Sequence, residues 1–233
     1  MSSDSLMAQR LQSVQQRIAQ ACAQAGRELD SVRLLPVSKT FPVPCVQQAM
    51  ALGLTRFAEN RMQDLRDKSQ ALAAANLQWV MIGHLQTNKA REAARYASEV
   101  QSLDRVSLAQ ALQQRLLLEE RHLDVLIQVK TSEEPSKHGV APAQLFELYD
   151  QLQEFSQLRV KGLMTVAGNY AQTAKVRACF AHLRELRDQL QARGHQEVTR
   201  LSMGMSGDLE LAILEGATEV RVGSALFGDR LYA

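Results

Sequence analysis

A lysine at the end of an apolar run is the first residue of this chain whose setting points to chemistry. Lys39 ends the run that begins at Val32, and Phe41 and Pro42 then turn the backbone out of strand geometry. A lysine between a buried strand and a loop loses hydration, which disfavours the ammonium form and lowers the pKa of the amine. A neutral amine can form a Schiff base with a carbonyl compound. Taken alone, the segment favours a lysine that merely extends to solvent and pairs with a carboxylate; the rest of the chain reverses that preference.

Two further segments, 201–208 and 220–228, each have the pattern of a strand that ends in glycine and serine before a helix. Small residues let backbone amides approach a ligand, and the N-terminus of a helix adds N–H groups and a favourable dipole. Ser206 offers a hydroxyl, while Gly223 and Ser224 offer amides and a second hydroxyl. A helix cap and ordinary turn glycines would explain either segment alone. Both together favour a phosphate site, which barrels commonly build after their last two strands.

An arginine precedes the second of these segments. Arg221 lies two residues before Gly223 and on the same face of the strand. A guanidinium beside a pyridine nitrogen keeps that nitrogen unprotonated, because a proton there would meet a like charge. Pairing of Arg221 with an acid such as Glu219 is the alternative. A nucleophilic lysine, a phosphate site and an arginine between them would together suit pyridoxal 5'-phosphate (PLP).

The elements that must position these groups alternate between strand and helix. The predicted strands are 32–39, 56–60, 79–83, 100–104, 124–130, 158–166, 199–203 and 219–223. A helix follows each strand, and an extra amphipathic N-terminal helix ends at Gly26. This pattern predicts an α/β protein with a single (β/α)8 TIM barrel over residues 1–233, and an open doubly wound sheet is the alternative. Polar residues fall at the carboxyl ends of the strands, where a barrel carries its chemistry: Lys39, Asn60, His84, Asp104, Lys130, Thr165, Ser202 and Arg221.

Composition limits the partners. The chain has 27 Lys and Arg against 25 Asp and Glu, a balance that favours neither a nucleic acid nor a membrane surface. No apolar run is long enough to span a membrane and no signal peptide is evident, so we expect a cytoplasmic protein. The three cysteines and five histidines lack ligand spacing, so we predict no metal. No apolar stripe demands a partner, and a monomer is expected.

Seven motifs lie in order along nearly the whole chain: VSKT at 37–40, FAEN at 57–60, IGHLQTNK at 82–89, SKHG at 136–139, GLMT at 162–165, SMGMS at 202–206 and RVGSALFG at 221–228. As a set they resemble the PLP homeostasis protein family. The resemblance implies a PLP-binding barrel similar to the N-terminal barrel of bacterial alanine racemase and eukaryotic ornithine decarboxylase. Two small departures leave the expected site intact: Ala58 stands where glycine is expected, and Ser224 where threonine is also common.

The resemblance also implies a role for individual residues. PLP would be bound by Lys39, Asn60, Met164, Ser206, Arg221, Gly223 and Ser224. Lys39 would hold it as a covalent internal aldimine, and Arg221 would face the pyridine nitrogen. The two serines and the glycine would bind the phosphate, while Asn60 and Met164 would line the ring.

No catalytic residue is predicted. A racemase needs a second acid or base on the opposite face of the bound cofactor, usually from another domain or subunit, and we expect no such domain after Ala233. His84 and Lys137 are the candidates for a replacement. An arginine at the ring nitrogen also weakens the ring as an electron sink. We therefore expect a protein that buffers PLP or delivers it to PLP-dependent apo-enzymes; a weak PLP-dependent racemase or decarboxylase, and a Schiff-base aldolase with a phosphate site, are the alternatives.

Overall fold

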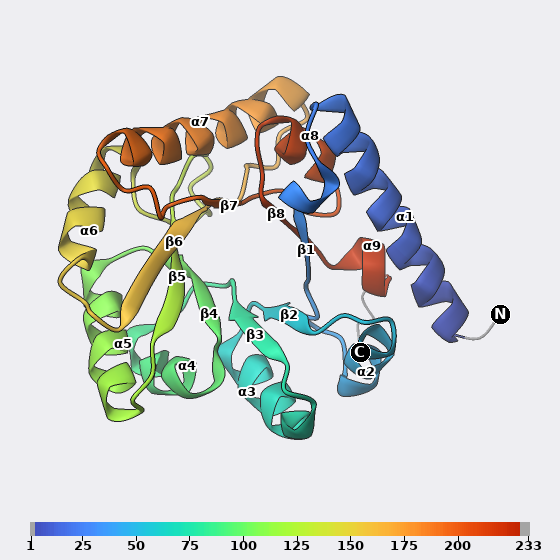
Figure 1. Ribbon diagram of the computed structural model, residues 1–233, viewed down its shortest axis with the longest axis horizontal. Coiled ribbons are helices and arrows are strands. Elements are labelled where there is room, and N and C mark those ends of the chain that lie inside the picture. Colours follow the sequence, from blue (N-terminus) through green and yellow to red (C-terminus); the bar gives the residue numbers. More distant parts are fainter. Residues whose placement is uncertain (1–2, 229–233) are drawn as a thin grey trace.

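The computed structural model of the protein describes residues 3–228, in which parallel strands form a barrel surrounded by helices (Figure 1). The strands are β1 Arg33–Pro36, β2 Arg56–Glu59, β3 Gln78–Met81, β4 Glu99–Leu103, β5 Leu123–Gln128, β6 Leu158–Met164, β7 Arg200–Ser202 and β8 Glu219–Val222. They pair in the order β1-β8-β7-β6-β5-β4-β3-β2. A bridge between Val37 and Ala58 joins the two end strands, and the Ser38 N–H donates to the Ala58 carbonyl at 3.0 Å. The predicted TIM barrel is confirmed.

Helices cover the outside of the barrel, as the alternating pattern predicts (Figure 1). They are α2 Val43–Ala51, α3 Met62–Ala71, α4 Ala90–Tyr96, α5 Val106–Leu118, α6 Leu145–Leu152, α7 Thr173–Ala192, α8 Leu209–Leu214 and α9 Ser224–Phe227. The extra N-terminal helix, α1 Ser3–Gln24, packs against α8 and α9. Within residues 3–228 no helix has the length and apolar character needed to cross a membrane.

The strands end one to three residues earlier than the sequence pattern predicts. The polar residues at their carboxyl ends leave the strand ladder and enter the loops at the mouth of the barrel. Lys39, for example, lies in a turn in which the Phe41 N–H donates to the Ser38 carbonyl at 3.1 Å. Ser202 and Arg221 differ from the others, because they lie within β7 and β8 and are 0% and 3% exposed.

The inside of the barrel is divided between apolar and polar side chains. Leu35, Val37, Ala58 and Val80 form a small apolar cluster separate from the main core, which lies between strands and helices. The rest of the interior carries hydrogen-bonded polar and charged groups that include Arg56, Glu99, Gln101, Arg200, Ser202, Glu219 and Arg221. A barrel interior of this kind can hold a buried cation in a fixed position, because each of these side chains makes at least one hydrogen bond to another of them.

Candidate functional site

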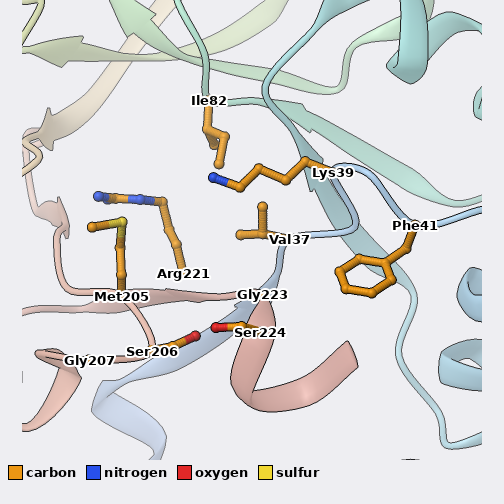
Figure 2. A pocket seen from close by; sticks show the side chains of 10 residues that line it. All are labelled: Val37, Lys39, Phe41, Ile82, Met205, Ser206, Gly207, Arg221, Gly223 and Ser224. Atoms are coloured by element: carbon orange, nitrogen blue, oxygen red, sulfur yellow. The ribbon is translucent and has the colours of Figure 1, made fainter. Parts of the chain in front are cut away.

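A cavity of about 270 Å³ lies at the carboxyl ends of β1 and β8 (Figure 2). It is lined by Val37, Lys39, Phe41, Ile82, Met205, Ser206, Gly207, Arg221, Gly223 and Ser224. The structure therefore brings together five of the seven residues that the sequence predicts for the site: Lys39, Ser206, Arg221, Gly223 and Ser224. The Lys39 side chain extends into the cavity beside Ile82, with its amine towards Arg221, and the hydroxyls of Ser206 and Ser224 face each other (Figure 2).

Arg221 is held by hydrogen bonds inside the barrel. Its Nη2 donates to the Thr165 carbonyl at 2.7 Å, and its Nη1 donates to Ser202 Oγ at 2.9 Å. Ser202 Oγ in turn donates to Gln101 Oε1 at 2.6 Å. Burial lowers the pKa of Arg221 to about 10, because removal from water disfavours the cation, while Glu219 opposes this effect. The guanidinium is therefore still charged at neutral pH.

This hydrogen-bond chain continues to the amino-terminal end of the barrel. Gln101 Nε2 donates to Glu99 Oε1 at 2.7 Å and also to Glu219. Since ionised carboxylates only accept hydrogen bonds, they orient the Gln101 amide so that its oxygen faces Ser202. Arg56 and Arg200 neutralise both carboxylates. Because the Ser202 hydroxyl donates its proton to Gln101, its oxygen is left as an acceptor for Arg221. This series of hydrogen bonds fixes the direction of the guanidinium.

The loop after β7 forms the wall opposite Lys39. Gly204 has φ +91°, and a Cβ there would lie 2.5 Å from the Ala212 Cβ, so this tight turn requires glycine. The Met205 N–H donates to Asp208 Oδ1 at 2.6 Å, which closes the loop that presents Ser206. Ser206 Oγ accepts a hydrogen bond from the Ala225 N–H at 3.3 Å. This contact joins the β7 loop to the start of α9, so the two segments predicted to bind phosphate lie side by side.

Helix α1 supports this wall from outside. Arg17 Nη2 donates to the Ser206 carbonyl at 2.9 Å. The same guanidinium pairs with both carboxylate oxygens of Glu210, with Nε to Oε1 at 2.6 Å and Nη2 to Oε2 at 2.9 Å. The side chains of Arg17 and Glu210 are 30% and 39% exposed. The N-terminal helix therefore fixes the backbone of Ser206.

Asn60 and Met164 lie outside the residues that line this cavity. Asn60 is exposed and lines a second hollow with His84 and Lys89. Met164 is 1% exposed and ends β6, directly before Thr165. Both residues therefore lie at the carboxyl ends of their strands, as the cavity does, and contact with a ligand in the cavity stays a prediction.

The two candidates for an extra acid or base lie at the mouth of the barrel. His84 is exposed, and its ring stacks on that of His138 with centroids 4.5 Å apart. Lys137 Nζ lies 3.6 Å from Glu134 Oε1, in the loop that follows β5. Neither residue lines the Lys39 cavity. Within residues 3–228 no group of three or more His, Cys, Asp or Glu side chains is placed to hold a metal ion.

Sequence reasoning missed several lining residues and the groups that support Lys39. Ile82, Met205 and Phe41 line the cavity through apolar atoms, a role that residue type alone does not mark. Lys68, which contacts the turn at Lys39, was also missed, although a signal existed. It follows Leu65 by three residues and precedes Leu72 by four, which places it on the buried face of its helix.

Residues 10–231 match the family model described as the alanine racemase N-terminal domain. The pyridoxal phosphate homeostasis protein of Aquifex aeolicus is 42% identical to this chain over 224 residues, which cover 96% of this chain and 98% of the relative. The protein of the same name from Escherichia coli is 35% identical, over 97% of this chain and 98% of the relative. The chain belongs to the pyridoxal phosphate homeostasis protein family.

Solved structures agree with this family assignment. PipY of Synechococcus elongatus, solved with PLP bound, matches with a TM-score of 0.84 and 36% identity, over 95% of this chain and all (100%) of PipY. The alanine racemase of Clostridium difficile matches with a TM-score of 0.71 at 11% identity, over 91% of this chain and 56% of the racemase. At that identity the second match shows the barrel fold alone.

Proposed function

We propose that this protein is a single-domain PLP-binding protein that holds PLP as a Schiff base on Lys39 and buffers it or delivers it to PLP-dependent apo-enzymes, without substantial turnover. The observation that carries the proposal is the meeting of three groups on one cavity: the Lys39 amine, the buried Arg221 cation and the two Ser-Gly loops. Relatives that cover nearly the whole chain are named pyridoxal phosphate homeostasis proteins, and PipY was solved with PLP bound.

The residues of the cavity fit such a group. Nothing lies within 4 Å of where a Cβ of Gly207 would be, so its backbone is open to a ligand, whereas a Cβ at Gly223 would come within 3.3 Å of the Val37 carbonyl oxygen. The glycines thus leave backbone amides accessible beside the hydroxyls of Ser206 and Ser224. We assign the phosphate to these residues. PLP, when bound, supplies an aldehyde for amines and a ring that withdraws electrons.

The chain's own residues would act in distinct ways. The Lys39 amine would add to the aldehyde carbon, and a carbon–nitrogen double bond would replace the carbon–oxygen one as water leaves. Arg221 would face the ring nitrogen and keep a proton off it, because its own charge is fixed inside the barrel. Asn60 and Met164 would lie around the ring, Asn60 from the loop after β2 and Met164 from the end of β6.

The test is the visible absorption spectrum of the purified protein with added PLP, before and after borohydride reduction, followed by mapping of the labelled peptide. We expect an absorption band that reduction abolishes and a label on Lys39. A protein that fails to take up PLP, or a label on another lysine, would contradict the proposal.

Turnover is tested separately by following the α-hydrogen of amino acids in deuterated water. A carrier leaves that hydrogen in place, whereas a racemase exchanges it with solvent. Exchange at a catalytic rate by the PLP-loaded protein would favour the enzyme over the carrier.

A further inference from the structure

The turn that presents Lys39 has a backbone conformation that its own sequence does not favour. Thr40 has φ 69°, in the left-handed region where a β-branched residue is strained. Residues 38–41 form a turn closed by the hydrogen bond from the Phe41 N–H to the Ser38 carbonyl, with Thr40 at the third position. Turns with a positive φ there normally have Gly or Asn at that position. Contacts from outside the turn must therefore hold it in place.

Two buried residues behind the turn, Glu59 and Lys68, supply such contacts; together with Ser38 of the turn itself we call them the Lys68 cluster. Lys68 Nζ donates to the Ser38 carbonyl at 2.8 Å and to Glu59 Oε1 at 2.6 Å. Ser38 Oγ donates to the same Glu59 oxygen at 2.6 Å. The Ser38 carbonyl thus accepts hydrogen bonds from both the Phe41 amide and the Lys68 ammonium. The cluster joins α3 and the end of β2 to the residue that immediately precedes Lys39.

Packing alone does not explain this arrangement. Ser38 and Glu59 are fully buried and Lys68 is 7% exposed, so two charges have been removed from water. Within residues 3–228, Glu59 Oε2 is buried without a hydrogen-bond partner. An ion pair in such a place is often no better for stability than apolar residues of similar volume. Lys68 shares the buried face of α3 with Met62 and Leu65, which pack in the main core, so an apolar residue would suit packing at this position.

We propose that Lys68, held by Glu59, is a positioning residue for Lys39. The ammonium fixes the Ser38 carbonyl, and this hydrogen bond keeps the strained turn in the form that directs the Lys39 amine into the cavity. Lys68 itself lies outside the residues that line the cavity, so its action is through the backbone. The inference rests on the proposed role of Lys39 as the Schiff-base lysine.

The experiment compares two ligands in the Lys68→Met protein. The first measurement is the rate of Schiff-base formation with PLP, followed by absorbance. The second is the affinity for pyridoxine 5'-phosphate, which has the ring and phosphate of PLP but no aldehyde. We expect the rate to fall about tenfold to a hundredfold, because a small displacement of a reacting amine is costly. The affinity for pyridoxine 5'-phosphate should change less than about twofold, since its binding needs no reaction at Lys39.

Two further variants separate positioning from general damage. Adding Thr40→Gly to Lys68→Met should restore most of the rate, because glycine adopts the turn without strain. Lys175→Met is the matched control, since this exposed lysine of α7 lies outside the cavity. Its rate should equal that of the unaltered protein. If Lys68→Met does not fold, Glu59→Gln weakens the same hydrogen bonds with less loss of packing and should slow the reaction by a smaller factor.

The outcomes are distinct. An unchanged rate in Lys68→Met overturns the inference. A slow rate that Thr40→Gly does not restore, together with an equal loss of pyridoxine 5'-phosphate affinity, assigns Lys68 a structural role only and overturns it as well. Failure of the unaltered protein to form a Schiff base would be seen before any variant is made, and would overturn the proposed function and this inference with it.

Discussion

The two walls of the cavity are each held by an ion pair, and the two pairs differ in burial. On the Lys39 side, the side chains of Lys68 and Glu59 are 9% and 0% exposed. On the Ser206 side, the side chains of Arg17 and Glu210 are 30% and 39% exposed. The cation of each pair also donates a hydrogen bond to a backbone carbonyl: Lys68 to that of Ser38, which precedes Lys39, and Arg17 to that of Ser206. Each wall is thus supported by an ion pair whose cation binds the backbone, and this pair is buried on the Lys39 side and partly exposed on the Ser206 side.

The difference in burial determines how much each ion pair contributes to the free energy of unfolding. Loss of one partner from a buried pair leaves an uncompensated charge away from water, which costs several kcal/mol. A partly exposed pair competes with water and with salt, and contributes little. We expect the wall with the reactive amine to be rigid under all ionic conditions, and the wall with the anion-binding loops to soften as salt rises.

The largest effect should come from the buried pair. Lys68→Met should lower the free energy of unfolding by about 3–5 kcal/mol, because Glu59 loses its buried cationic partner. Urea unfolding at low and high salt measures this loss, which should be the same at both. A loss below about 1 kcal/mol would place Lys68 among ordinary surface lysines and remove the contrast between the walls.

Next in size is the effect of removing the amine itself. Lys39→Ala should abolish borohydride-stable labelling but leave binding through the phosphate loops, with affinity reduced about a hundredfold, or about 2.7 kcal/mol. Equilibrium dialysis with PLP measures the residual affinity, and inorganic phosphate should compete for it. Complete loss of binding would mean that Ser206, Gly223 and Ser224 do not form the phosphate site.

A smaller effect is expected from removing Arg17, the cation of the partly exposed pair. Arg17→Ala should lower the free energy of unfolding by about 0.2–1 kcal/mol, an effect that salt reduces. The affinity for pyridoxine 5'-phosphate should fall more than the rate at Lys39, because the Ser206 carbonyl loses its donor. Arg193→Ala, on an exposed arginine just after α7, is the matched control and should leave affinity unchanged. Equal effects on both measurements would contradict independent support of the two walls.

The smallest effect concerns pH at the mouth of the barrel. Burial lowers the pKa of His84; Asp104 opposes this, and His138 and Arg105 add to it. The folded state therefore binds this proton less tightly than the unfolded state does. The stacked contact of His84 with His138 then contributes to stability above the ordinary histidine pKa of about 6.5, and this contribution is lost as pH falls below that value. Hydrogen exchange of residues 131–139 should increase over that range. His84→Gln should remove the dependence, whereas His182→Gln on α7 should retain it.

The sequence predicted the barrel because the signals for it are local. Each strand is a short apolar run and each helix has its own periodicity, so neither depends on distant residues. The five cavity residues were predicted for a related reason: in a barrel the carboxyl ends of all strands meet at one face. The bounds of the strands were less accurate, since the point at which Lys39 leaves the ladder is decided by contacts of Ser38 with other elements.

The supporting groups could not be predicted in the same way. Glu59 and Lys68 are nine residues apart on different elements, and a lysine on a helix is usually exposed. Gln101 and Ser202 are 101 residues apart, and only the barrel shows that they hold Arg221. These contacts depend on register and depth in the barrel, which the spacing of residue types does not specify.

The position of α1 bears on the order in which the cavity is assembled. Lys68 and Ser38 are 30 residues apart, whereas Arg17 and Glu210 are 193 residues apart. Contacts between distant segments close large loops and form slowly. During refolding we therefore expect protection from hydrogen exchange around Lys39 before protection around Ser206. A partly folded chain would have its reactive amine in place before it could anchor a phosphate, so stable capture of the ligand would mark completion of the barrel.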